Sequence, residues 1–158
     1  MFREMRRKKQ EIGREGCVAV LKNAKRGVLS ILGDDGYPYG IPLNHFYDEK
    51  TNAIYFHCAK EGHKIDAIKR CDKASFCVLS NGKQNDGEWF LRFESVVCFG
   101  KIRLVEGEEE KRTICDGLCE KFGRDETYRK EEWEKYKKNV ACLALTVESM
   151  TGKAVKEE

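Results

Sequence analysis

The sequence predicts a mainly β, α+β domain in which six antiparallel strands form a Greek-key barrel with accessory helices. Three observations lead to this prediction. Short apolar or alternating runs, typical of β-strands, fill much of the chain between residues 27 and 106. An amphipathic and then a charged helical segment follow, and another strand-like run comes after them. At 158 residues the chain has the usual length of a single domain.

The first runs indicate a helix followed by a hairpin. Residues 14–25 have the spacing of an amphipathic helix. The apolar run at 28–32 ends at Asp-Asp-Gly, and Asp-Gly between two strand-like runs is a strong hairpin signal. The returning run, residues 37–47, contains both prolines of the chain, which predicts an edge strand or an interrupted ladder. A third run at 53–58 follows a short loop, so we expect these three runs to form an antiparallel meander.

The later runs complete the barrel. A short helix is expected at 62–70 and a strand at 73–80. In the long run 89–105 the apolar residues change from odd to even positions, which predicts a bulge or bend near 95–100. The predicted division of the single domain 1–158 is an N-terminal helix (1–26), barrel strands (27–106), an insert of two helices (107–138; helices 108–122 and 126–138), a closing strand (139–149) and a tail (150–158).

Composition excludes several classes of protein. The chain is 41% hydrophobic and 36% charged with only 2 prolines, so it is neither disordered nor fibrous. Its net charge is +3, and acidic residues are interleaved with the basic ones, so a nucleic-acid surface is not expected. The basic run at 6–9 is interpreted as a solvated helix start. No apolar run approaches the ~20 residues of a membrane span, and no apolar segment follows the basic start. We therefore expect a cytoplasmic protein that binds neither nucleic acid nor membrane.

The 8 cysteines are expected to be reduced and structural. No CxxC pair occurs, which argues against the common structural zinc sites. A free thiol in an apolar strand behaves as a small hydrophobe, and four cysteines lie in such runs: Cys58, Cys77, Cys98 and Cys142. Cys58 is the one exception, because it lies near Lys60 and His63 at a helix start, where the pKa of a thiol can fall and its reactivity rise.

The segment from Tyr55 to Lys64 carries the clearest chemical signal. A strand ends, a glycine-containing loop follows, and a helix begins at His63 and Lys64. The unpaired N–H groups and partial positive charge of a helix N-terminus attract anions, and these two residues can add charge. A bound phosphate suits this arrangement. An ordinary helix start with solvated side chains suits it equally well.

The three histidines have different expected roles. His45, His57 and Cys58 with His63 could be considered metal ligands. However, His57 and Cys58 alternate on a strand and point to opposite faces, so we expect no metal site. His45 either protonates a bound substrate or forms a hydrogen-bonded wall. His63 is expected to be a phosphate ligand first and a reactive group second.

Several stretches, in their order, resemble the FMN-binding split barrels of the pyridoxamine-phosphate-oxidase-like family, most closely the nitroimidazole-resistance branch. They are GVLSI, GYPYGIPLNHFYD, IYFHCAKEGHKIDAI, SVVCFGKI and the final TGK, and they cover most of the chain. The resemblance implies a split β-barrel homodimer with FMN at the subunit interface, acting as an oxidoreductase on a small, nitro-aromatic substrate. The alternative within this fold is a module that binds flavin, deazaflavin or haem without turnover, with a histidine as axial haem ligand.

The resemblance also assigns residues to the cofactor. It places the phosphate at His63 and Lys64 and the flavin ring near residues 29–30 and 42–44. Cys58 stands where relatives carry a small polar residue, and because a thiol is a weak donor, backbone N–H groups would contribute more. The full expected FMN set is Leu29, Ser30, Pro42, Leu43, Asn44, His57, Cys58, Ala59, Gly62, His63 and Lys64, with Ser95 and Lys101 from the second subunit. The candidate catalytic residues are His63 and His45. The aromatic residues Trp89, Phe90, Phe93 and Phe99 are expected in the core or the dimer interface.

Overall fold

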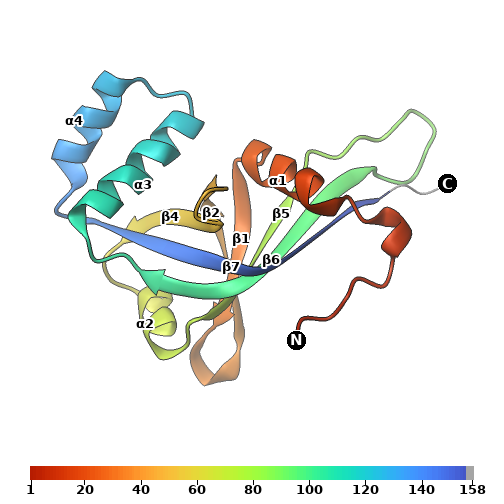
Figure 1. The fold of residues 1–158 in the computed structure, drawn as a ribbon, viewed down its shortest axis with the longest axis horizontal. Helices are drawn as coiled ribbons and strands as arrows, with labels where there is room; N and C mark the ends of the chain where they lie inside the picture. The colour runs from red at the N-terminus through yellow and green to blue at the C-terminus, as the bar shows by residue number, and fades with distance from the viewer. Residues whose placement is uncertain (156–158) are drawn as a thin grey trace.

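The computed structural model describes residues 1–155 and shows one antiparallel sheet curled into a half-barrel with four α-helices around it (Figure 1). The sheet order is β2-β1-β5-β6-β7-β4-β3, and every pair of neighbours is antiparallel. The strands are β1 (Arg26–Leu32), β2 (Pro38–Asn44), β3 (Phe46–Asp48), β4 (Ala53–Ala59), β5 (Lys73–Leu79), β6 (Phe93–Leu104) and β7 (Val140–Val155). The helices are α1 (Gly13–Asn23), α2 (His63–Arg70), α3 (Glu108–Lys121) and α4 (Glu126–Tyr136).

The helical runs predicted at 14–25, 62–70, 108–122 and 126–138 agree with the four helices to within two residues at each end. The wider N-terminal helix predicted for 1–26 is wrong, because only Gly13–Asn23 of that segment is α-helical. The main core fills the inside of the curl, where α1 and α2 pack on the sheet around Phe56 and Phe76, both fully buried. A second core lies between α3 and β4 and β7, around Ile114 and Leu118. None of the helices within residues 1–155 is both long and apolar enough to cross a membrane.

The predicted second run of the meander, residues 37–47, is divided between two strands, so the sheet has seven strands and not six. The run at 37–47 forms β2 at one edge of the sheet and β3 at the other, so the edge position predicted from the prolines is confirmed. Between the two strands lies His45, which is fully buried and bonds to the Leu21 carbonyl of α1. The chain therefore passes from one edge of the sheet to the other at His45, whose side chain is held in the interior.

The predicted bulge lies where it was expected, but the additional residue is on the neighbouring strand. Phe99 of β6 pairs with Ser149, and Gly100 pairs with Val147, so Glu148 of β7 is the extra residue. A Cβ at position 100 would collide with the backbone carbonyl of Thr146, which explains the glycine there. This crowding accompanies the bend of the two long strands.

Two predicted boundaries of these long strands are wrong. β7 continues through residue 155, so most of the predicted tail is strand paired with β6; residues 156–158 lie outside the described part. β6 begins at Phe93 and not at Trp89, whose exposed fraction is 83%. The aromatic residues of this segment are therefore not core residues, since Phe99 is also 43% exposed and Phe90 is only partly buried.

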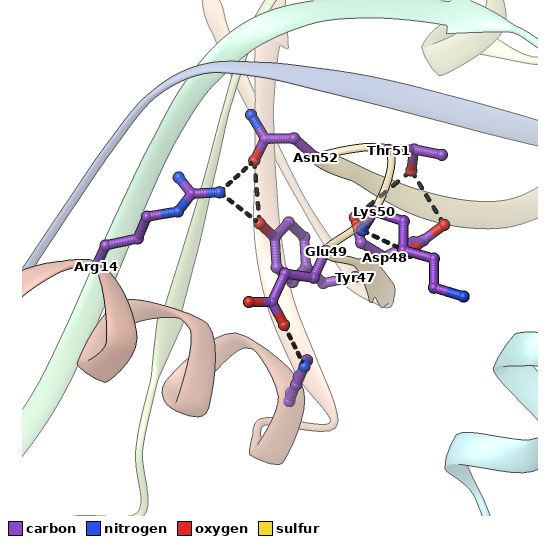
Figure 2. A network of polar contacts seen from close by, with 8 residues as sticks. Arg14, Tyr47, Asp48, Glu49, Lys50, Thr51 and Asn52 are labelled. Atoms are coloured by element: carbon purple, nitrogen blue, oxygen red, sulfur yellow. Dashed lines mark hydrogen bonds and ion pairs between the residues drawn. The ribbon is translucent and has the colours of Figure 1, made fainter.

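A polar network ties the turn between β3 and β4 to α1 (Figure 2). Arg14 donates to the Tyr47 hydroxyl over 3.5 Å and to Asn52 Oδ1 over 3.3 Å, and the Tyr47 hydroxyl donates to the same Oδ1 over 3.0 Å. Asn52 also donates through Nδ2 to the carbonyl of Val147 over 3.0 Å. Because Asn52 has a φ of 51°, a conformation that asparagine tolerates better than most residues, the network also holds the turn geometry.

Candidate functional site

The start of α2 presents an anion-binding geometry. Gly62, with a φ of 123°, precedes the helix, and its carbonyl accepts the N–H groups of Ile65 and Asp66 over 2.9 and 3.2 Å. The N–H groups of His63 and Lys64 at the first turn have no intrahelical partner. The Lys64 side chain is half-buried and has no acidic partner within residues 1–155. A half-buried ammonium beside free backbone donors is suited to binding a phosphate.

His63 is held by the β1–β2 hairpin. Its ring stacks on Tyr39, with centroids 4.2 Å apart and planes 10° apart. Its Nε2 lies 3.5 Å from a carboxylate oxygen of Asp34, and the same carboxylate accepts a bond from Arg70 over 2.5 Å. Asp34 was not predicted as a neighbour of the site. With the imidazole turned to Asp34, the backbone N–H of His63 is the more direct donor to an anion at the helix start.

His57 and Cys58 lie on opposite faces of β4, as predicted. His57 is opposite Cys142 of β7 on the face that α3 and α4 cover, whereas Cys58 packs against the main core. Desolvation and the nearby charge of Lys64 lower the pKa of His57. Burial raises the pKa of Cys58 although Lys64 acts in the opposite direction, so the expected reactive thiolate at Cys58 has no support. Lys64 is therefore close enough to influence both side chains.

The residues predicted around the flavin ring divide between two faces of the sheet. Leu29 is fully buried and Leu43 packs on the main core, so neither offers more than its backbone to a ligand outside. Ser30 and Pro42 alternate with them and face outward. Asn44, at the end of β2, accepts a bond from Arg26 Nε over 2.9 Å and keeps its amide N–H₂ group for another partner.

The outward side of β1, β5 and β6 carries an exposed apolar surface next to Ser30. This outer apolar face consists of Val28, Leu32, Leu79 and Phe99, which are 41%, 48%, 58% and 43% exposed. Paired strands place these residues on one side, because Ser30 pairs with Ser75 and Ser75 with Phe99. Several exposed apolar side chains on one side of a sheet are typical of an interaction site.

Ser95 and Lys101, predicted to reach the cofactor from a second subunit, both lie on β6. Ser95 is nearly buried between Leu79 and Lys153, and Lys101 is exposed with its Nζ 3.9 Å from Asp72. Ser95 and Lys101 are six residue steps apart along the strand, about 20 Å, so they can contact only different parts of one ligand.

His45 is a buried part of the fold. Its Nε2 is 2.8 Å from the Leu21 carbonyl, and the Lys121 ammonium donates to the carbonyls of Ala24 and His45 over 2.6 and 2.9 Å. Burial and the Lys121 charge lower the pKa of His45 to about 4, and burial lowers the pKa of Lys121 to about 8. Since His45 has no exposed surface, the geometry favours the wall residue over the proton donor to a substrate. Lys121 was not predicted, and no local sequence signal places it here.

A pocket of about 500 Å³ lies between the end of β4 and the two insert helices, α3 and α4. Three predicted site residues, His57, Cys58 and Ala59, form one wall. The other walls carry the aromatic side chains Tyr128, Trp133 and Tyr136 and the thiols Cys115 and Cys119. Among residues 1–155 no three histidine, cysteine or acidic side chains gather in a way that could hold a metal ion.

The comparisons with known proteins agree with this fold. The crystal structure of a candidate 5-nitroimidazole antibiotic resistance protein from Bacteroides thetaiotaomicron has a TM-score of 0.78 at 24% identity, over 91% of this chain and 86% of that one. An FAD-binding protein from Mesorhizobium loti has a TM-score of 0.70 at 20% identity, over 93% and 98%. An FAD- and haem-binding protein from Mycobacterium smegmatis has a TM-score of 0.75 at 19% identity, over 94% and 74%.

No curated protein matches the sequence. The structural similarities above establish the split-barrel fold that the sequence predicted. The family model of pyridoxamine 5'-phosphate oxidase matches residues 13–154, nearly the whole described chain. The chain therefore belongs to the pyridoxamine 5'-phosphate oxidase family.

Proposed function

We propose that this protein is an FMN-binding oxidoreductase that works as a cytoplasmic homodimer and reduces a small, nitro-aromatic substrate. The observation that carries the proposal is the start of α2. There Lys64 is half-buried, has no acidic partner within residues 1–155, and lies beside free backbone donors. Family membership supports the flavin, and the similarity to the Bacteroides protein supports the substrate class.

The residues present fit FMN. Lys64 and the first N–H groups of α2 would hold the phosphate. Ser30, Pro42 and Asn44 face outward along β1 and β2, which run from the hairpin beside His63. The free amide group of Asn44 suits the polar edge of the flavin ring. When bound, FMN supplies the hydride or electron transfer, and the chain orients it and excludes water.

The proposed second subunit would cover the outer apolar face. This face borders Ser30. A second copy packed there would cover the end of the site where the flavin ring is expected, and would bring Ser95 and Lys101 of the partner subunit near that ring. Phe99 lies between Val28 and Leu32 along this face, level with Ser30, and is 43% exposed. Stable dimers of this kind commonly bury ~2,000 Å² or more.

Exchanging Lys64 for alanine tests the phosphate site. Lys64→Ala should weaken FMN binding about 10- to 150-fold, the equivalent of ~1.5–3 kcal/mol for a charge-assisted bond, and leave riboflavin binding nearly unchanged. Lys60→Ala, an exposed lysine in the preceding loop, is the matched control. Titration by flavin fluorescence measures all four affinities. Equal losses for FMN and riboflavin would show that Lys64 supports the fold and not the phosphate.

Replacing an apolar side chain on the outer face tests the dimer. Phe99→Asp should convert the dimer to a monomer in light scattering at micromolar concentration and weaken FMN binding at the same time. Phe122→Asp, on a residue of similar exposure at the end of α3, is the control and should remain dimeric. A wild-type protein that is monomeric with FMN bound would contradict the proposal.

A second function, binding of haem without turnover, is favoured by one observation. The pocket of about 500 Å³ beside His57 is large and aromatic, and His57 could serve as an axial ligand. The visible spectrum of freshly purified protein separates the two functions. Flavin bands support the first, and a Soret band that is lost in His57→Ala supports the second.

A further inference from the structure

Three thiols gather where α3 packs on the sheet. Cys115 and Cys119 lie one turn apart on α3 and line the pocket. Cys142 lies beneath them on β7 and is fully buried. Its Sγ is 3.8 Å from the Sγ of Cys115, and no other two thiols within residues 1–155 make such a contact.

We propose that Cys115 and Cys142 form a redox-active dithiol, which a hydroperoxide entering the pocket oxidises to an intramolecular disulfide. A disulfide requires the two sulfurs to approach to about 2.05 Å, so the 3.8 Å gap must close by small side-chain rotations. The dithiol lies on the opposite side of β4 from Cys58 and does not require flavin. Its chemistry therefore does not depend on FMN bound at the start of α2, although it uses His57 and the pocket considered above for haem.

The surroundings give the two thiols different roles. Cys115 is half-buried in the pocket wall, so a small oxidant can reach it, and its hydrogen-bonding contact with the Cys142 thiol lowers the pKa of Cys115. The Cys142 thiol also lies 3.8 Å from the Lys111 carbonyl, and its pKa is raised by the bond to Cys115 and by burial. The thiolate is the attacking form of a cysteine, so Cys115 is the group that reacts first and Cys142 is the one that resolves.

His57 is placed to help the second step. It lies directly opposite Cys142 in the ladder between β4 and β7, where Cβ atoms of facing residues are about 4.5–5.5 Å apart. Both side chains point to the α3 face, and His57 also lines the pocket. The lowered pKa of His57 keeps its imidazole neutral and able to accept a proton.

The chemistry balances in two steps. The Cys115 thiolate attacks one oxygen of the hydroperoxide, the O–O bond breaks, and the other oxygen leaves as water or an alcohol after taking a proton. Cys115 is then a sulfenic acid. The Cys142 sulfur, after giving its proton to His57, attacks the Cys115 sulfur, and the sulfenic oxygen leaves as water with that proton. Two thiols are oxidised to one disulfide, and one peroxide is reduced.

The test is oxidation of the full-length protein with one equivalent of hydrogen peroxide, followed by alkylation and peptide mass mapping. The expected product is a single disulfide joining Cys115 and Cys142, which dithiothreitol reverses. Cys119→Ser removes a thiol from the same helix and pocket and should leave this product unchanged. Cys115→Ser should abolish it.

Cys142 is buried, so its replacement risks unfolding the protein. Two measurements that leave Cys142 in place therefore test the proposal further. In the wild type, Cys115 should react with iodoacetamide faster than Cys119, and His57→Gln should slow disulfide formation without changing the product. A disulfide between Cys115 and Cys119, an irreversible sulfinic acid at Cys115, or peroxide consumption that is unchanged in Cys115→Ser would each overturn it.

Discussion

His45 and His63, the two candidate catalytic residues, lie in contrasting surroundings. His45 has no exposed surface, and its Nε2 bonds to the Leu21 carbonyl. The His63 side chain is 41% exposed, stacks on Tyr39 and faces Asp34. Both were candidate catalytic residues in the sequence. In the structure His45 is a buried part of the fold, whereas His63 lies at the start of α2, where the geometry suits a phosphate.

The difference shows that burial, and not residue type, decides what a histidine near a site can do. The partner that fixes His45 comes from the far end of α3, because the Lys121 ammonium lies 3.3 Å from Nε2 and donates to the His45 carbonyl. The partners that fix His63 come from a neighbouring hairpin. Stability measurements should therefore respond to changes at His45, and ligand measurements to changes around His63.

The largest expected effect is a loss of stability in acid caused by His45. Its folded-state pKa is about 4, below the ordinary value of 6.5, so between these pH values the unfolded chain binds a proton that the folded protein does not. Stability should therefore fall as pH falls from 6.5 to 4, by about 3 kcal/mol from this group, at about 1.4 kcal/mol per pKa unit. Urea unfolding across this range measures it.

His45→Gln is the variant that isolates this effect, because its side-chain N–H₂ can still donate to Leu21 while it does not titrate. Its stability should depend less steeply on pH than that of the wild type between pH 4 and 6.5. His63→Gln is the matched control and should keep the wild-type slope. If the two variants had the same slope, the acid sensitivity would come from other groups.

A somewhat smaller effect is expected from Lys121. Lys121→Met keeps most of the aliphatic stem but removes the donor to two carbonyls, that of Ala24 at the end of α1 and that of His45 between β2 and β3. Buried acceptors left without a donor cost about 1–3 kcal/mol, so we expect the free energy of unfolding at pH 7 to fall by about 2 kcal/mol. Lys111→Met, on the same helix and half-buried, should change it little. If Lys121→Met were more stable than the wild type, the free energy needed to bury the ammonium would exceed the stabilisation from its hydrogen bonds.

The sequence was informative where a pattern is local. Helical spacing placed the four helices, and the Asp-Gly turn and the two prolines placed β1 and the edge strand β2. The division of the run at 37–47 could not be foreseen, because the contacts of His45 that hold it are made with α1 and α3. The strand character of residues 150–155 was also missed. Its side chains alternate weakly, and pairing with β6 decides its conformation.

The same limit applies to the candidate site. The helix start at His63 and Lys64 was visible, because a strand, a glycine and a helix follow one another in the sequence. The stacking of Tyr39 on His63 and the contact of Cys115 with Cys142 join residues from different elements. Neither local periodicity nor motif spacing records such contacts, so they could be found only in the structure.

The smallest expected effect on stability is that of His63. Its stacking on Tyr39 and its contact with Asp34 are both solvent-exposed, and exposed contacts of this kind contribute less than about 1 kcal/mol. His63→Ala should therefore leave the free energy of unfolding within about 1 kcal/mol of the wild type, in contrast to the variants of Lys121. Because the backbone N–H of residue 63 remains, FMN binding should weaken less than in Lys64→Ala. A loss of FMN affinity equal to that of Lys64→Ala, with riboflavin unaffected, would instead assign the imidazole itself to the phosphate and would require it to turn away from Asp34.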